Sequence, residues 1–314
     1  MRGYERIATT TDRARPAQRM GVARQLRKAG VPGLLFIGPA LILNVFLFLI
    51  PLVRVVWISL HDWPVLGDRP FIGLDNYTAL RHDTAFWNSL LFTVKYTLLV
   101  TPAIFIPALI LALLVNERIR GVTVFRAIYF TPYVIAFVTG SLMWKWLYND
   151  VFGLFSYGLM RLGLISESIL WLGSPNMAMF SIILSVVWKT AGLNMVLLLG
   201  GLQAIPSDLY EAAAMDGASA WQRFTRITLP LLRPTFAIVL TVSVLGSFLA
   251  FDQFQIMTAG GPGRATTTIV MQIRKVSFDF FELGAGAAMS IVLLAILVVL
   301  SYLQIRILRQ VHDF

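Results

Sequence analysis

EAAAMDGASAWQRFTRITLPLLRP, residues Glu211–Pro234, is a polar segment between two long apolar stretches of a 314-residue chain. Ser207, which precedes this segment, is expected to cap a short helix with Asp208 and Glu211 in its first turn, because a serine side chain accepts a bond from a free amide of that turn. Gly217 is expected to end that helix, because glycine adopts the left-handed conformation at little cost. Ser219 and Gln222 have the spacing of a capping box at the start of a second helix. The segment therefore predicts a helical hairpin with a glycine elbow.

The residues of this hairpin leave two interpretations open. Trp221, Phe224 and Ile227 form an apolar stripe on the second helix, and Pro230 disfavours its continuation. Such a stripe is typical of an amphipathic hairpin that lies on a membrane surface. The alanine-rich first helix, however, is slim, and a slim helix before an elbow suits insertion into a groove on another protein.

The remainder of the chain is strongly apolar. Hydrophobic residues make up 57% of it, and the mean hydropathy is +0.75. Soluble domains average about 45–50% apolar residues, so the composition predicts an all-α, polytopic membrane protein. Six apolar segments have roughly the 20 residues that a bilayer span needs, at about Gly33–Leu60, Asn88–Val115, Phe125–Tyr148, Ala178–Leu202, Pro234–Met257 and Gly284–Ile307.

Several function classes lack the residues that they need. There is no cysteine, and His61, His82 and His312 are scattered without a metal-binding spacing, so no metal site is expected. No GxxxxGK[ST] motif occurs, so the chain is not expected to bind ATP itself. The net charge of +10 does not indicate nucleic-acid binding, because much of it lies in the N-terminal tail and the short loops.

The distribution of basic residues orients the spans. The N-terminal tail, the Glu117–Arg126 turn, the hairpin and the C-terminal tail hold sixteen Lys or Arg, and the loops on the other side hold six. By the positive-inside rule, both termini and the hairpin are expected in the cytoplasm. Residues 1–32 are expected to form a basic cytoplasmic tail, and residues 33–314 a membrane domain that contains the hairpin at about 207–234.

The hairpin resembles the EAA coupling loop of the membrane-spanning subunits of binding-protein-dependent ABC importers. The matching positions are Glu211, Ala212, Ala213, Asp216, Gly217, Ala218, Phe224, Leu229 and Pro230. Other segments narrow the resemblance to permeases for carbohydrates and glycerol-phosphate-like solutes. They are FIGLDNY at Phe71–Tyr77, GLQAIP at Gly201–Pro206, the FD…T.GGP…T pattern from Phe251 to Thr268, and AGAAMS at Ala285–Ser290.

The resemblance implies a type I ABC importer permease. The nine hairpin residues would then couple the chain to an ATPase. The implied partners are a second, homologous permease subunit, two ATPase subunits that bind ATP and Mg, an external substrate-binding protein and a sugar or sugar-like solute. The implied location is the cytoplasmic membrane of a bacterium or archaeon, with no cofactor in the chain itself.

Two other classes of protein function have less support in the sequence. An ion-coupled secondary transporter would show acidic residues in its spans, and this chain offers little beyond Asp252. An intramembrane enzyme would need a catalytic constellation such as paired histidines or a serine with a buried base, and none is visible in the sequence.

A sugar pathway needs hydrogen-bonding groups and aromatic surface in a cavity. The candidates are Trp188, Lys189, Thr190, Asn194, Ser247, Phe251, Asp252, Gln253 and Gln255. Lys189 lies near mid-span, where a charge must face water, an acid or a ligand. It stands about 140° around the helix from Asn194, so the two do not share a narrow face. Lys189 is favoured as the cavity residue, with Asp252 as a possible partner.

Overall fold

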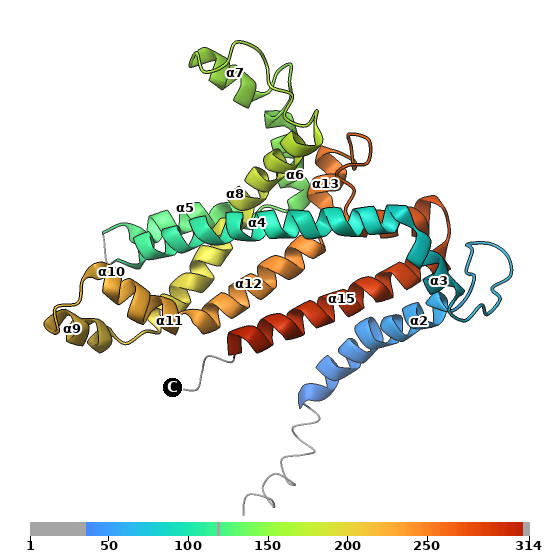
Figure 1. Cartoon of the computed structure of the whole chain (residues 1–314), viewed down its shortest axis with the longest axis horizontal. Helices are drawn as coiled ribbons and strands as arrows, with labels where there is room; N and C mark the ends of the chain where they lie inside the picture. Colours follow the sequence, from blue (N-terminus) through green and yellow to red (C-terminus); the bar gives the residue numbers. More distant parts are fainter. Residues whose placement is uncertain (1–35, 118–119, 310–314) are drawn as a thin grey trace, which may run out of the picture. The chain divides into compact units, whose positions relative to one another are not determined.

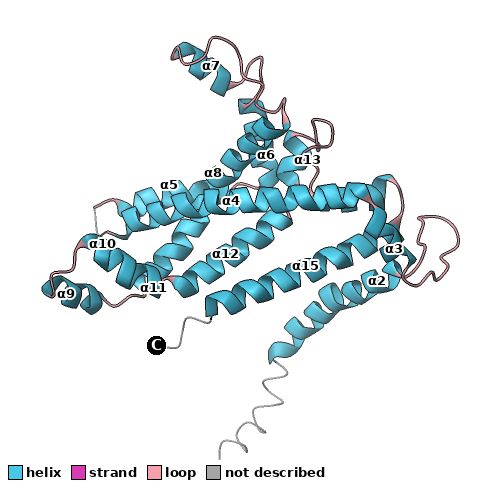
Figure 2. Ribbon diagram, in the orientation of Figure 1, coloured by secondary structure: helices cyan, strands magenta, loops and turns pink. Residues whose placement is uncertain are grey.

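The structure, a computed structural model, describes residues 36–117 and 120–309 (Figure 1). The predicted tail, residues 1–32, lies outside these ranges, and the division into tail and membrane domain stays a prediction. Figure 2 shows helices joined by loops. Within the described ranges there is no strand, only two isolated bridges, His61 with Phe71 and Pro64 with Glu282. The all-α prediction is confirmed.

The chain divides into two compact units, one ending at Val55 and the other beginning at Val56. The first described helix, Phe36–Ser59, begins in the first unit and has 24 residues, enough to cross a membrane. It contains the π-helical turn η1 (Val45–Leu49) and continues as α2 (Ile50–Ser59).

The second unit supplies three more helices of spanning length: α4 (Thr84–Asn116), α8 (Pro175–Gln203) and α15 (Leu283–Arg309). Two bent helix pairs raise the number of candidate spans among the described residues from four to six, which agrees with the sequence prediction. The shorter elements are α3 (Asp75–His82), α7 (Leu154–Arg161), α9 (Ser207–Met215), α10 (Ala220–Arg223), η2 (Phe224–Thr228), α11 (Leu229–Leu231), α13 (Asp252–Met257), α14 (Ile269–Arg274) and η3 (Lys275–Asp279).

The third predicted span is not continuous. It consists of α5 (Val122–Val134) and α6 (Phe137–Leu147), whose axes differ by 95°. Ile135 and Ala136 are extended, with ψ of 133° and 145°, and interrupt the helix between them. Hydropathy does not detect such a break, because the residues on both sides of it are apolar.

The fifth predicted span, Pro234–Met257, is also divided. Its main helix, α12 (Arg233–Phe248), meets the preceding helical run Ala220–Leu231 at 64° and ends nine residues before Met257. The short helix α13 begins only at Asp252. Asp252 lies in the first turn of α13, where the helix dipole favours a carboxylate.

Two glycines allow the long helices to approach closely. A Cβ on Gly192 of α8 would collide with the Tyr129 carbonyl group of α5, and a Cβ on Gly201 would collide with the Thr235 side chain of α12. Small residues at such points let helix backbones pack directly in a membrane. The backbone of α5 therefore packs against α8 at Gly192, and α12 packs against the C-terminal end of α8 at Gly201.

Two loop motifs that the sequence analysis singled out have structural roles in this chain. Asn76 of FIGLDNY donates to the Ser59 and His61 carbonyls at 2.8 and 3.0 Å, and so fastens α3 to the end of α2. In the GGP loop, the Thr258 and Thr266 hydroxyls lie 2.8 Å apart, and Gly260 has a φ of +84°. These bonds order the segment between α2 and α3 and the loop that leads to α14.

Candidate functional site

The first helix of the hairpin, α9, ends as predicted but begins differently. Its N-cap is Pro206, which makes no side-chain cap bond, so the prediction of Ser207 as the cap is wrong. The Ser207 hydroxyl instead donates to Asp208 at 3.4 Å. At the other end Gly217 is left-handed, with φ +77°. The amides of Gly217 and Ala218 donate back to Ala214 and Ala213 at 3.1 and 2.9 Å, which satisfies the free carbonyls of the last turn.

The second helix of the hairpin begins with the predicted capping box. The Ser219 amide donates to Gln222 at 2.7 Å, and the Gln222 amide donates to the Ser219 hydroxyl at 3.3 Å. The helix does not stop at Pro230, however, but runs to Leu231 before the 64° bend. The π-helical turn η2 precedes the proline, and a widened turn of this kind accommodates an interruption of the α-helical bonding. The helix therefore ends one residue after Pro230, the residue that was expected to disfavour its continuation.

The nine predicted coupling residues divide by exposure. Glu211, Ala212, Asp216 and Gly217 are exposed, while Ala213, Ala218, Phe224, Leu229 and Pro230 are half-buried. The exposed part of the hairpin also carries the large apolar side chains of Leu209, Met215 and Trp221, of which Met215 is 89% exposed. Exposed apolar groups beside a carboxylate form a surface suited to docking on another protein.

A second site is a cavity of about 170 Å³ between α4, the α5–α6 bend, α8 and α12. Its polar lining comes from Thr190, Asn194, Ser243, Ser247 and Gln253, and its aromatic lining from Tyr96, Tyr133 and Phe137. The Ser243 hydroxyl donates to the Asn194 side chain at 3.4 Å, and the Gln253 amide to the Tyr96 hydroxyl at 3.4 Å. Hydroxyls, amides and ring surfaces are the groups that bind a polyhydroxylated solute.

The structure brings together four of the nine predicted pathway residues in this cavity: Thr190, Asn194, Ser247 and Gln253. Trp188 and Lys189 line a neighbouring crevice of only about 10 Å³. Phe251, Asp252 and Gln255 line neither cavity. Sequence reasoning missed Tyr96, Tyr133, Phe137 and Ser243. Ser243 lies one helical turn before Ser247, so the two serines share a face of α12, and this spacing could have identified Ser243 as a lining residue.

Lys189 is not paired with Asp252. The only ion pair among the described residues joins Arg274 and Asp279 at 2.9 Å. The Lys189 ammonium instead donates to the carbonyls of Pro132, Tyr133 and Ile135 at the α5–α6 break. Of the two residues compared in the sequence, it is Asn194 that lines the larger cavity. The expectation failed because the break, which supplies carbonyl partners, was not visible in the sequence.

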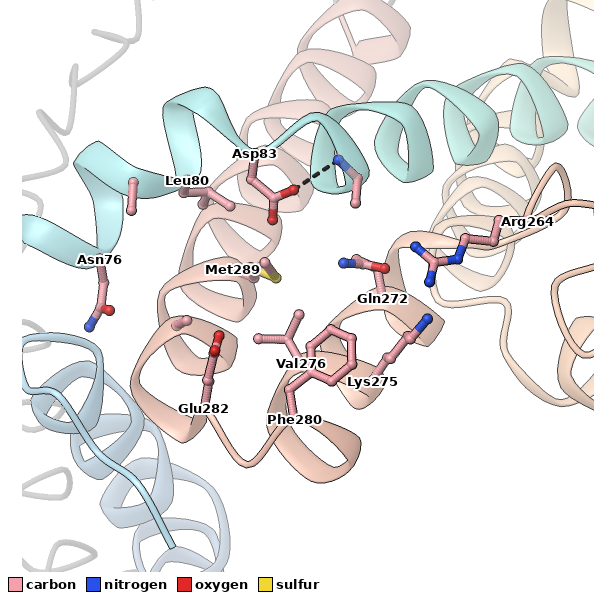
Figure 3. Close-up of a pocket in the computed structure, with 13 residues that line it drawn as sticks. Asn76, Leu80, Asp83, Arg264, Gln272, Lys275, Val276, Phe280, Glu282 and Met289 are labelled. Atoms are coloured by element: carbon pink, nitrogen blue, oxygen red, sulfur yellow. Dashed lines mark hydrogen bonds between the residues drawn. The ribbon is translucent and has the colours of Figure 1, made fainter. Parts of the chain in front are cut away.

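A third cavity, of about 330 Å³, lies among α3, the start of α4, the GGP loop, η3 and α15 (Figure 3). Arg264, Gln272 and Lys275 reach toward it from one side, and Asp83 and Glu282 from the other. Leu80, Val276, Phe280 and Met289 contribute apolar side chains to its lining. The cavity thus combines apolar surface with separated positive and negative groups.

Comparison with known proteins identifies the family. Residues 77–312 match the family described as "Binding-protein-dependent transport system inner membrane component". The chain belongs to this family. It is the membrane-spanning subunit of a binding-protein-dependent importer and a multi-pass membrane protein, as the coupling-loop resemblance implied. The match favours this reading over the ion-coupled secondary transporter.

Named relatives of this permease are transport proteins, in agreement with the expectation that the chain is not an enzyme. The MalF permease of a trehalose/maltose transport system from Thermococcus litoralis is 39% identical over 272 residues, which cover 86% of this chain and 90% of that protein. The SmoG permease of a sulfoquinovosyl glycerol transport system from Agrobacterium fabrum is 36% identical, with 88% and 89% covered. The UgpA permease of an sn-glycerol-3-phosphate transport system from Salmonella typhimurium is 34% identical, with 87% and 92% covered.

The fold of the permease is also that of a solved importer. A chain of a bacterial ABC transporter involved in the import of the acidic polysaccharide alginate matches with a TM-score of 0.80, over 93% of this chain and all of that one. The two sequences are 21% identical, so the likeness concerns the fold alone.

Proposed function

We propose that this permease forms, with a second, homologous permease subunit, the translocation pathway for a sugar or sugar-like solute that an external binding protein delivers. Two ATPase subunits, which hold the ATP and Mg, drive the cycle through the hairpin Glu211–Pro234. The membrane is the cytoplasmic membrane of a bacterium or archaeon, and both termini and the hairpin face the cytoplasm. This orientation rests on the distribution of basic residues.

The observation that carries the coupling proposal is the geometry of the hairpin. Its elbow is held by the Gly217 and Ala218 amide bonds. Its outer side exposes Met215 and also Glu211, whose side chain makes no hydrogen bond or ion pair with the described residues. An ordered helix with an exposed apolar and acidic side fits the helix-in-groove mode of recognition. Glu211 is the charge that the ATPase groove would meet.

The substrate class is supported by the lining of the 170 Å³ cavity and by the names of the relatives. The relatives are named for transport of trehalose and maltose, sulfoquinovosyl glycerol and glycerol 3-phosphate, all of which are rich in hydroxyl groups. The cavity offers Asn194, Ser243 and Gln253 as hydrogen-bonding groups beside three aromatic rings. An aromatic ring gives the flat apolar face of a sugar a matching surface.

The external binding protein is proposed to contact the cavity of Figure 3. Apolar surface surrounded by charges of both signs is the usual anatomy of a protein interface, where the charges select and orient the partner. If this contact forms, the double variant Arg264→Glu with Lys275→Glu will weaken stimulation of ATP hydrolysis by the binding protein. Basal hydrolysis will be unaltered. Equal stimulation of the variant and the wild type would contradict this contact.

The test of the coupling proposal is charge reversal at Glu211. The side chain is exposed and makes no hydrogen bond or ion pair in the described part of the chain, so Glu211→Lys will leave the permease folded and inserted. We expect it to lose ATP-driven uptake in proteoliposomes or to release the ATPase. Glu167→Lys, an equal change in an exposed loop after α7, is the matched control and will transport normally. Full uptake by Glu211→Lys would reject the proposal.

A further inference from the structure

The break between α5 and α6 leaves carbonyl groups that need partners. The last four carbonyls of a helix have no acceptor role within it, and Pro132 and Tyr133 belong to the final turn of α5. Ile135 follows in extended conformation, so its carbonyl is also outside the helical ladder. In a membrane, backbone groups that find no partner are costly, and non-helical backbone is tolerated only where protein or water satisfies it.

The Lys189 ammonium supplies those partners. Its Nζ atom donates to the Tyr133 carbonyl at 3.2 Å and to the Pro132 carbonyl at 3.5 Å, and it also contacts the Ile135 carbonyl closely. An ammonium has three donors, and three carbonyls receive them. The Phe137 ring lies 4.6 Å from Nζ and the Tyr133 ring 5.7 Å, so aromatic faces complete the surroundings of the charge.

Lys189 reaches the break because α5 approaches α8 closely at this level. Gly192 lies one helical turn after Lys189, and its missing Cβ admits the Tyr129 carbonyl group of α5. The end of α5 is therefore within the length of the lysine side chain. Lys189 itself is only 5% exposed, which leaves little room for a solute at its ammonium.

The residues on both sides of the break form part of the 170 Å³ cavity. Tyr133 precedes the break, Phe137 follows it, and both line that cavity. We propose that Lys189 is a positioning residue: it caps the end of α5, holds the third span bent, and thereby keeps Tyr133 and Phe137 in the cavity wall. The last step rests on the proposed function, because only that function gives the cavity a role in translocation.

The bend is measurable as a distance between two nitroxide labels. The chain has no cysteine, so cysteines at Val124 in α5 and Trp146 in α6, which are 61% and 56% exposed, can be labelled alone. An unbroken helix between them would be about 33 Å long at a rise of 1.5 Å per residue. With the observed 95° bend, the two arms put their ends about 22 Å apart.

We expect Lys189→Met, which keeps the apolar stem and removes the donors, to shift the electron–electron distance toward the longer value in the complex in nanodiscs. Lys189→Arg retains donors and will keep the short distance. Lys145→Met removes an exposed lysine of α6 and is the matched control, also with the short distance. If Lys189→Met does not insert, Lys189→Gln, with two donors, will give a broadened distribution. An unaltered short distance in Lys189→Met, or in Lys189→Gln where that variant replaces it, would overturn the cap.

Uptake distinguishes failure of this inference from failure of the proposed function. The distance measurement requires neither solute nor ATP, so it judges the cap by itself. In proteoliposomes, a positioning role predicts a several-fold higher half-saturating solute concentration for Lys189→Met, with rescue by Lys189→Arg. A lengthened distance combined with wild-type uptake would overturn the link between the bend and the cavity.

Discussion

The hydroxyl groups of Tyr210 and Thr228 lie 2.9 Å apart and join the first helix of the hairpin to the end of its second. Thr228 is buried and Tyr210 is half-buried, whereas Glu211, the next residue along α9, is exposed. The bond thus lies on the inner side of the hairpin and leaves the outer side free. The proposed coupling role requires the hairpin to move as one body, and this is the one side-chain hydrogen bond between its two helices in the described part of the chain.

Tyr210→Phe will loosen the hairpin without removing it. The variant loses one neutral hydrogen bond, which contributes about 1 kcal/mol, and keeps the ring. We expect amide exchange in α9 to accelerate about fivefold and ATP hydrolysis to become partly independent of solute. Tyr157→Phe, which removes a hydroxyl in α7 that accepts from Arg161, is the control. Equal exchange rates in α9 of wild type and Tyr210→Phe would show that the bond does not stiffen the hairpin.

Gly217 permits a graded test of the elbow. Its φ of +77° is unfavourable for side chains, but nothing lies within 4 Å of a Cβ placed there, so substitution acts through backbone strain alone. Asparagine tolerates this conformation better than alanine, and valine tolerates it least. Uptake is expected to fall in the order Gly217→Asn, Gly217→Ala, Gly217→Val, at similar amounts of inserted protein. Wild-type uptake by all three variants would exclude a role for the left-handed turn.

Substitution of Gly246 tests whether the 170 Å³ cavity belongs to the translocation pathway. Gly246 lines this cavity, and no atom lies within 4 Å of a Cβ built on it. The Cβ of Gly246→Leu therefore meets no neighbouring element, and the rest of the side chain occupies cavity volume. We expect uptake to be lost while the complex still assembles. Gly200→Leu is the matched control, because Gly200 of α8 has equally open space but does not line this cavity. Normal uptake by Gly246→Leu would remove the cavity from the pathway.

The orientation of the chain is testable with the same cysteine-free background. A cysteine at Glu167, in the exposed loop after α7, is expected to react with a membrane-impermeant thiol reagent in intact cells. A cysteine at Arg226 in the hairpin will react only after the cells are permeabilised. Labelling of Arg226→Cys in intact cells, with protection of Glu167→Cys, would reverse the predicted topology.

The sequence predicted the elements that depend on local chemistry. The capping box at Ser219 and the left-handed Gly217 follow from side-chain and backbone preferences of single residues, and the six spans follow from hydropathy. The breaks at Ile135 and before Asp252 did not emerge, because apolar residues continue through them. The surroundings of Lys189 were missed for the same reason, since its partners are backbone carbonyls that only the break makes available.

The start of α9 and the end of the second hairpin helix each lie one residue from the position that the sequence suggested. Both involve a proline: Pro206 occupies the cap position expected for Ser207, and the π-helical turn η2 before Pro230 allows the helix to continue past that residue. The cavity was predicted in part, since Asn194 and Ser247 were recognised on single spans. Tyr96 was missed because its place in the cavity depends on how α4 packs against the other helices.

The central claim is that the hairpin is the surface on which an ATPase docks. A photo-crosslinking amino acid at Met215, which is 89% exposed on α9, tests it most directly in the native membrane. Leu164, 67% exposed in the loop after α7, is the control on the side predicted to face outward. The account predicts an adduct between the Met215 position and a P-loop ATPase, and none from Leu164. Absence of an ATPase adduct from Met215, or an equal adduct from Leu164, would contradict it.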